Sequence, residues 1–226
     1  MNIGVLGTGI VAKTIAGKLD ALGHTVKLGT RDPKATLGRG EPDMFGGPPI
    51  RTWLESHPKV TLGTFVEAAR HGAIVFDALS GQGALPALEA AAPGLEGKIL
   101  VDISNPLDFS KGFPPSLSVS NSDSLGEQTQ RALPSTKVVK TLNTVNAYLM
   151  VDPQSLAHGD HTMFVAGDDA EAKGEVTKIL KEWFGWSDVI DLGDIQNARG
   201  LEMWLPLWTR LYGALKTGTF NLKVVR

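Results

Sequence analysis

Residues 2–12 read NIGVLGTGIVA, and this stretch decides the fold. A short apolar run up to Leu6 predicts a buried strand, and apolar residues at helical spacing begin at Val11. The turn between them has the pattern G-x-G-x-x-A. Its first glycine permits a tight turn, its second lets the backbone approach a diphosphate, and Ala12 lets the helix pack close to the sheet. We therefore predict a dinucleotide site in which the start of the helix holds the diphosphate. The predicted contacts come from Gly7, Thr8, Gly9, Ile10 and Val11.

Strand and helix patterns alternate along the rest of the chain. Further predicted strands are apolar runs at 25–28, 74–79, 99–103, 138–142, 162–166 and 189–192. This alternation is typical of α/β proteins and predicts a Rossmann-type, doubly wound parallel sheet with a small C-terminal α/β extension. We place a nucleotide-binding domain at 1–145 and the smaller domain at 146–226. The smaller domain is expected to complete the pocket for a second substrate.

Two segments are predicted as irregular loops, and two helix signals stand out in the C-terminal third. Residues 33–49, which are rich in Gly and Pro, and residues 107–121 are the loops. Asp168 is expected to cap a helix. The last helix is expected at 197–215, with Pro206 kinking or dividing it. Aromatic side chains form a stripe on this helix, which favours a homodimer interface.

The end of the second strand predicts which dinucleotide binds. NAD sites usually place a carboxylate there for the ribose 2′-hydroxyl, whereas this chain reads Leu28-Gly29-Thr30-Arg31. A guanidinium is suited to a 2′-phosphate, Thr30 adds a hydroxyl donor, and Lys34 adds positive charge. Asp32 is the opposing signal, but Pro33 after it indicates a residue that caps a local turn. The alternative is that Arg31 is simply a solvated surface cation. We predict NADP.

Small polar residues follow three of the predicted strands. Since ligands bind beyond the carboxyl ends of parallel strands, these residues are candidates for holding the nicotinamide and its ribose. They are Ser80, Gly81 and Gln82, then Ser104 and Asn105, and then Asn143, Thr144 and Asn146. Taken singly, each is better explained by the loop preference of Ser and Asn, and only together do they indicate a nicotinamide site. None is a strong acid or base.

Composition excludes several classes of function. The net charge of −2 provides no field for nucleic acid or an anionic membrane, and the absence of cysteine excludes thiolate chemistry and Cys-based metal centres. His158, Asp160 and His161 lie close together, but a metal site needs three or four converging ligands, so we predict none. The apolar N-terminus reads as a buried strand rather than a signal peptide, so a cytoplasmic location is expected.

Beyond these local signals, the chain resembles a known family along nearly its whole length. The stretches VLGTGIVAKTIAGKL, ALGHTVKLGTRDP, VVKTLNTVNA, VAGDDAEAK and FNLKVV occur in the order typical of NADPH-dependent reductases of coenzyme F420, a deazaflavin. The resemblance implies direct hydride transfer between nicotinamide and deazaflavin, with the 2′-phosphate on a Ser/Thr-Arg pair at Thr30 and Arg31. Thr8, Ser80 and Val145 would line the stacked rings. Archaeal members tend to have His where this chain has Asn143.

Two other functions remain open from the sequence. One is an NADPH-dependent reductase of another acceptor, such as an imine, a flavin or a ferric complex. Pyrroline-5-carboxylate reductases share the N-terminal pattern, but the segment after Asn146 leaves little room for their extended helical domain. The other is an NADPH-binding sensor without enzymatic activity, which the lack of an acid or base permits. All three functions imply a small-molecule ligand.

Overall fold

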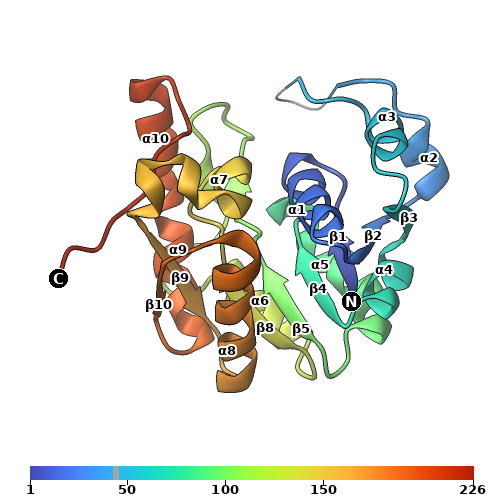
Figure 1. Cartoon of the computed structure of the whole chain (residues 1–226). Helices are drawn as coiled ribbons and strands as arrows, with labels where there is room; N and C mark the ends of the chain where they lie inside the picture. Colours follow the sequence, from blue (N-terminus) through green and yellow to red (C-terminus); the bar gives the residue numbers. More distant parts are fainter. Residues whose placement is uncertain (43–45) are drawn as a thin grey trace.

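The computed structural model describes residues 1–42 and 46–226, and one eight-stranded sheet forms its centre (Figure 1). The strands follow the order β10-β9-β8-β5-β4-β1-β2-β3, and all neighbours run parallel except β8 and β9. Their bounds are β1 Asn2–Leu6, β2 Thr25–Thr30, β3 Thr61–Thr64, β4 Ile74–Asp77, β5 Ile99–Asp102, β8 Lys137–Thr141, β9 Thr162–Ala166 and β10 Asp188–Asp191. The order from β3 to β8 is that of the doubly wound dinucleotide fold. The predicted fold class is therefore confirmed.

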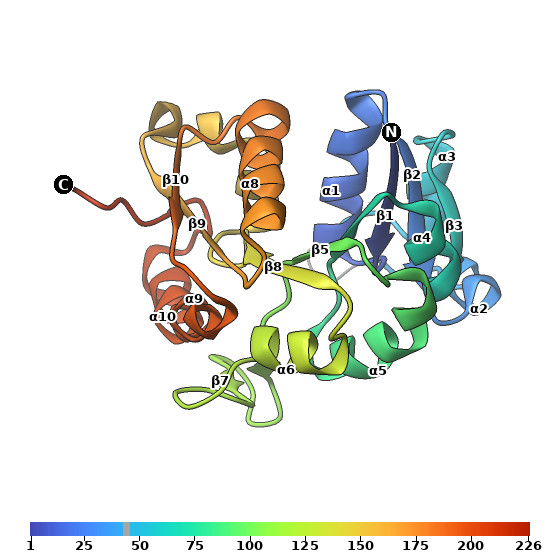
Figure 2. The same ribbon diagram turned by 90° about the horizontal axis from the view of Figure 1, so that it is seen from below.

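Helices cover both faces of the sheet, which explains why its central strands are apolar throughout (Figure 2). One face carries α1 (Ile10–Ala21), α7 (Ala147–Val151) and α8 (Ala170–Ile179). The other carries α4 (Phe65–His71), α5 (Gly81–Ala91) and α6 (Leu125–Ala132). The apolar stripe predicted for the first helix is buried at Ile15 and Leu19, whereas Leu22 lies beyond the helix end and is exposed.

The C-terminal residues pack against the far end of the sheet. The predicted last helix is divided into α9 (Ala198–Met203) and α10 (Leu205–Leu215), and Pro206 lies in the first turn of α10, where a proline needs no N–H partner. After α10 the chain runs past β9, where the N–H of Thr162 donates to the carbonyl of Leu222 at 2.9 Å. The last residues then project away from the body (Figure 1).

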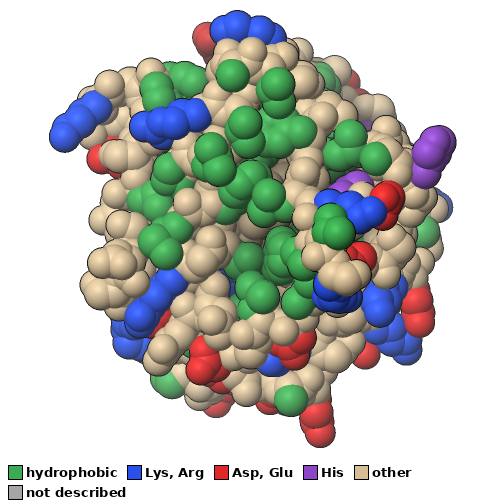
Figure 3. Space-filling model, turned by 90° about the vertical axis from the view of Figure 1, so that its left-hand side faces the viewer, with side chains coloured by type: hydrophobic (Ala, Val, Ile, Leu, Met, Phe, Trp, Pro, Cys, Tyr) green, Lys and Arg blue, Asp and Glu red, His purple; other side chains and the backbone are tan. Residues whose placement is uncertain are grey.

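Apolar side chains are exposed on one side of this C-terminal part. Met203, Leu207, Tyr212 and Leu215 on α9 and α10 are all exposed, and the ring of Phe113 meets Tyr212 edge-on. Figure 3 views the molecule from the left-hand side of Figure 1, where α10 lies, and shows hydrophobic side chains gathered in the middle of that face. We refer to these five residues as the α10 face.

The structure corrects the prediction that 33–49 is a loop throughout. Residues Pro33–Leu37 form helix α2, and Ile50–Glu55 form α3 directly after the segment. The Asp32 carboxylate caps α2 by accepting the N–H of Ala35 at 3.0 Å, with Pro33 in the first turn. This confirms that Asp32 caps locally. Residues 43–45 of the predicted loop lie outside the described residues.

Three further elements differ from the prediction. Strand β3 was not expected, because its sequence TLGT holds one large apolar residue. Asp169 rather than Asp168 caps α8, since its carboxylate accepts the N–H of Ala172 at 2.8 Å. The segment 107–121 contains a small antiparallel hairpin of β6 (Leu107–Asp108) and β7 (Ser116–Leu117).

Candidate nucleotide-binding site

The glycine turn between β1 and α1 has the geometry that the sequence pattern predicts. Gly7 has a φ of +117°, and a Cβ there would lie 2.6 Å from the carbonyl oxygen of Ala78, so only glycine fits. Gly9 precedes α1, no side chain caps the helix, and a Cβ at Gly9 would meet nothing within 4 Å. Open space therefore lies over the positive end of the α1 dipole, where a diphosphate is favoured.

The end of β2 presents a positive charge. Arg31 is exposed, and among the residues that the structure describes it has no hydrogen-bond or ion-pair partner. Lys34 is exposed on α2 nearby in the chain, while the carboxylate of Asp32 is occupied by its cap. Thr30 is buried, with its hydroxyl 2.9 Å from that of Thr36. One hydroxyl of this pair donates to the other, so one hydrogen of the two stays available.

The structure brings together the polar segments that follow β4, β5 and β8. The side chain of Asn105 donates to the carbonyl of Asn143 at 3.0 Å and accepts from the Asn143 amide at 2.9 Å. The backbone of Asn105 also touches the start of α5, because a Cβ at Gly81 would overlap the carbonyl oxygen of Asn105. Asn105 thus joins all three segments at the carboxyl edge of the sheet.

The side chains predicted to line the site differ in accessibility. Thr8 is partly exposed and Ser80 is exposed at the start of α5. Ser104 is buried, and its hydroxyl donates to Asp102 at 2.6 Å. Val145 is buried, and so is Thr144, whose carbonyl accepts from Trp204 at 3.0 Å. Asn143 Oδ1 and Thr144 Oγ1 are buried and have no hydrogen-bond partner within residues 1–42 and 46–226.

A group of buried charges beneath this edge was missed by sequence reasoning. Lys140 on β8 is fully buried, and its Nζ lies 3.1 Å from Asp102 Oδ2 and 2.9 Å from Glu202 Oε1. Asp102 on β5 and Glu202 on α9 are also buried. The sequence did hold a signal, because Asp77, Asp102 and Lys140 each end or interrupt an apolar strand. These three residues stand side by side in the register of neighbouring strands.

Burial and neighbouring charges shift the pKa values of two of these groups. Burial, followed by the nearby charge of Asp102, raises the pKa of the Asp77 carboxyl to about 8, which favours its protonated form at neutral pH. Burial alone would lower the pKa of Lys140, but the carboxylates of Asp102 and Glu202 raise it above its ordinary value. Lys140 is therefore a permanent cation below the carboxyl edge.

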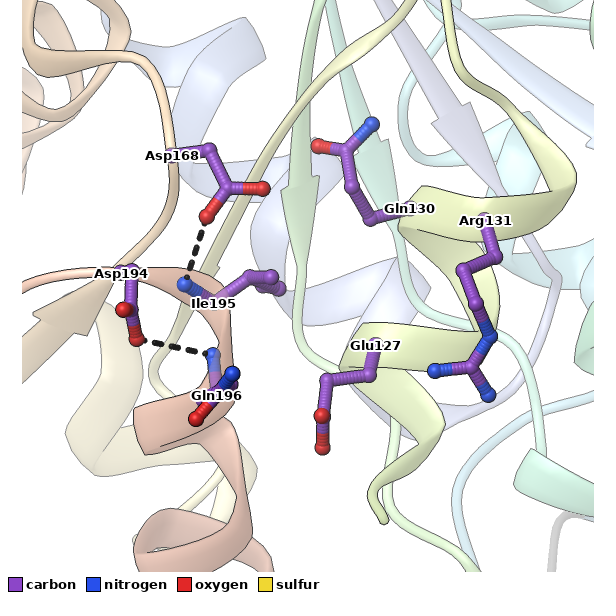
Figure 4. A pocket seen from close by; sticks show the side chains of 7 residues that line it. All are labelled: Glu127, Gln130, Arg131, Asp168, Asp194, Ile195 and Gln196. Atoms are coloured by element: carbon purple, nitrogen blue, oxygen red, sulfur yellow. Dashed lines mark hydrogen bonds between the residues drawn. The ribbon is translucent and has the colours of Figure 1, made fainter.

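A separate pocket of about 230 Å³ lies at the opposite edge of the sheet, near the carboxyl ends of β9 and β10 (Figure 4). Its three carboxylates are bonded within the protein. Asp168 Oδ1 accepts the N–H of Ile195 at 3.0 Å, and Glu127 pairs with Arg199 at 2.6 Å. It contains none of the residues predicted for the dinucleotide.

Both ring nitrogens of His161 form hydrogen bonds, one with the carbonyl of Pro153 and the other with the side chain of Asn221. Within the described residues, every helix is too short or too polar to cross a membrane.

The chain is similar to known proteins in both sequence and structure. The family model described as NADP oxidoreductase coenzyme F420-dependent matches residues 2–106. A crystal structure from Arthrobacter sp. FB24, assigned as an F420-dependent NADP reductase, is 57% identical, covers 100% of both chains and superposes with a TM-score of 0.95.

Two curated proteins are more distant relatives. The F420-dependent NADP reductase of Methanothermobacter marburgensis is 26% identical over 93% of this chain and 92% of its own length. The metalloreductase STEAP3 of Rattus norvegicus is 28% identical over 92% of this chain. This chain spans only 38% of the length of that metalloreductase.

Proposed function

Because the chain belongs to the family of coenzyme F420-dependent NADP reductases, we propose that it transfers a hydride between NADP(H) and the deazaflavin coenzyme F420. The predicted family, an NADP-dependent oxidoreductase, is confirmed by the full-length relative at 57% identity. The observation that carries the proposal is the exposed guanidinium of Arg31 at the end of β2, which has no partner among the described residues and suits a 2′-phosphate, while the neighbouring Asp32 carboxylate caps α2.

The proposed roles follow the geometry of the site. The open space at Gly9 and the start of α1 would hold the diphosphate, and Thr30, Arg31 and Lys34 would hold the 2′-phosphate. Ser80, Gly81, Ser104, Asn105, Asn143 and Thr144 would form the edge on which the nicotinamide ribose and carboxamide rest. The buried acceptor Asn143 Oδ1, which has no partner among the residues that the structure describes, supports a donor from the ligand at this edge. Thr8, Ser80 and Val145 would line the ring-stacking region.

The chemistry needs no acid or base from the protein. NADPH supplies the hydride, and the deazaflavin accepts it together with one proton from solvent, so that oxidised F420 becomes its dihydro form. The residues at the carboxyl edge bind, orient and exclude water, and these are the contributions that matter when two preformed rings react. The absence of an ionisable side chain among the predicted ring-lining residues therefore agrees with the proposal.

The test is to mix NADPH with oxidised F420 and follow the deazaflavin absorbance. We expect turnover with NADPH and little with NADH. Binding of NADPH without turnover would instead support the sensor. Turnover only with an imine, a flavin or a ferric complex would support the other reductase.

The domain division, the oligomeric state and the location are part of the same proposal. We propose that residues 1–145 bind NADP, that 146–226 complete the second pocket, and that two chains associate through the α10 face into a homodimer. The exposure of five large apolar side chains on that face supports the interface. A cytoplasmic location is supported by the charged co-substrates that the reaction uses and by a sequence without cysteine.

A further inference from the structure

A buried lysine lies directly beneath the edge that the proposed function assigns to the nicotinamide. The ammonium of Lys140 has three partners, which is as many as it has hydrogens. Two are the carboxylates of Asp102 and Glu202, and the third is the backbone carbonyl of Ser104 at 2.6 Å. Burying an unpaired ammonium group carries a large desolvation penalty, so the buried position of Lys140 depends on all three contacts.

Lys140 and Asp102 together hold every polar atom of Ser104. The N–H of Ser104 donates to Asp102 Oδ1 at 2.9 Å and its hydroxyl donates to the same oxygen at 2.6 Å. The carbonyl of Ser104 accepts from Lys140. The position of the peptide group between Ser104 and Asn105 is therefore fixed by Asp102 and Lys140.

Asn105 passes this constraint to the other two segments of the edge. Its backbone carbonyl lies against Gly81, where any side chain would overlap it, and its side chain forms two hydrogen bonds with Asn143. A displacement of Asn105 would thus move or loosen the segments after β4 and β8 as well. All three segments depend on one buried ion pair.

Stability alone does not explain why this ion pair lies here. Buried ion pairs can be replaced by apolar side chains of similar volume at little or no cost in stability. Glu202 has its own partners, since its carboxylate accepts the N–H groups of Leu125 and Gly126 at the start of α6. Glu202 therefore retains two hydrogen bonds without Lys140.

We propose that Lys140, paired with Asp102, is a positioning residue that sets the place of the nicotinamide ring through Ser104 and Asn105. It does not touch the ligand. The inference rests on the proposed function for the identity of the ring, and it requires that the adenosine half of the nucleotide bind independently of this pair.

The test variant is Lys140→Met combined with Asp102→Asn, which removes the Lys140–Asp102 pair without leaving either of these two residues charged, while Glu202 keeps its two N–H donors from Leu125 and Gly126. Asn at 102 can still accept from Ser104. The fluorescence lifetime of bound NADPH reports how firmly its nicotinamide is held. We expect this lifetime to shorten and single-turnover hydride transfer to F420 to slow by about 10- to 100-fold. Affinity for 2′-phospho-ADP-ribose, which lacks the nicotinamide, should stay within about twofold, the range for a site left intact.

A matched control exists at the other edge of the sheet. Lys173 on α8 is nearly buried and bonds a carboxylate, that of Asp191 at 2.8 Å, and a backbone carbonyl, that of Gly193 at 2.8 Å. The double variant Lys173→Met with Asp191→Asn should keep the lifetime and the rate of the native protein.

An unchanged lifetime in the folded test variant, or equal changes in the control, would overturn the proposal. If the test variant does not fold, Asp102→Asn alone replaces it, with a smaller shortening expected and an unchanged lifetime again decisive. The lifetime needs NADPH only. A failure of the native protein to reduce F420 would therefore count against the proposed function and leave this measurement valid.

Discussion

At the scale of single residues, Arg31 should decide the choice between the two nicotinamide nucleotides. Replacing it by alanine should weaken NADPH binding by about 1.5–3 kcal/mol, the range for a hydrogen bond to a charged group. NADH binding should barely change, because NADH has no 2′-phosphate for the guanidinium to meet. Isothermal calorimetry with both nucleotides measures this difference, and Lys178→Ala, which removes an exposed cation from α8, is the control. Equal losses for both nucleotides would contradict the assignment.

The two glycines of the turn should fail in different ways when each is replaced by alanine. Gly7→Ala should cost about 1–3 kcal/mol of folding stability, because the new Cβ would sit at a positive φ and 2.6 Å from a carbonyl oxygen. Gly9→Ala should leave the stability nearly unchanged, since its Cβ points into open space. That space is the proposed diphosphate site, so NADPH affinity should fall about tenfold or more.

Urea unfolding and a binding titration on both variants separate these effects. A Gly9→Ala protein with native affinity would show that the diphosphate lies elsewhere. The geometry of the glycine turn was predictable from sequence because it depends on local backbone conformation, and the exposure of Arg31 was predictable because a guanidinium is ordinarily solvated. The burial of the Ser104 and Thr144 side chains was not predictable, because it depends on how the ends of β5 and β8 pack in the folded sheet.

At the scale of secondary-structure elements, the sequence predicted every strand of the large sheet except β3, and it did so most clearly where the apolar residues are buried on both faces. Strands β1, β4, β5 and β8 are of this kind. Strand β3 is held by its pairing with β2 and has no apolar run of its own, so no local sequence pattern predicted it. Helix α2 did have a local signal, the Asp32-Pro33 start, but the glycines and prolines after it obscured its short length.

The carboxyl group at the end of β4 should make stability depend on pH. The pKa of Asp77 is about 8 in the folded protein against 3.8 in the reference state, so the folded protein binds one more proton than the unfolded chain between these values. Stability should therefore fall as pH rises through this window and level off above about pH 8. The variant Asp77→Asn mimics the protonated acid and keeps an acceptor for the N–H of Leu79, which Asp77 now bonds at 3.0 Å.

Chemical denaturation of both proteins from about pH 6 to about pH 9 tests this effect. The variant should gain on the native protein by at least about 1 kcal/mol over that range, since one pKa unit corresponds to about 1.4 kcal/mol. Parallel stability curves for the two proteins would show that Asp77 is ionised at neutral pH.

At the scale of the whole molecule, a single sheet is assembled from two parts of the chain, and its carboxyl edge depends on both. Glu202 on α9 balances the charge of Lys140 on β8, and Trp204 bonds the carbonyl of Thr144 beyond that strand. The sequence predicted the helices and strands on either side but not these contacts. They join residues far apart in the chain, and the only local signal was the presence of charges in apolar strands.

We expect two chains to associate through the α10 face. Leu207 is 52% exposed on α10, within a cluster of apolar side chains that a second copy would cover. Leu207→Glu would place a charge in that contact and require its desolvation, so the variant should sediment as a single chain of 24.1 kDa while the native protein sediments at twice this mass. Leu22→Glu is the matched control, because Leu22 is also exposed, at 44%, but lies beyond the end of α1. NADPH affinity should be the same in all three proteins, because the nucleotide edge is built within one chain. A native protein that sediments as a monomer at micromolar concentration would refute the dimer, and the α10 face would then remain for another partner.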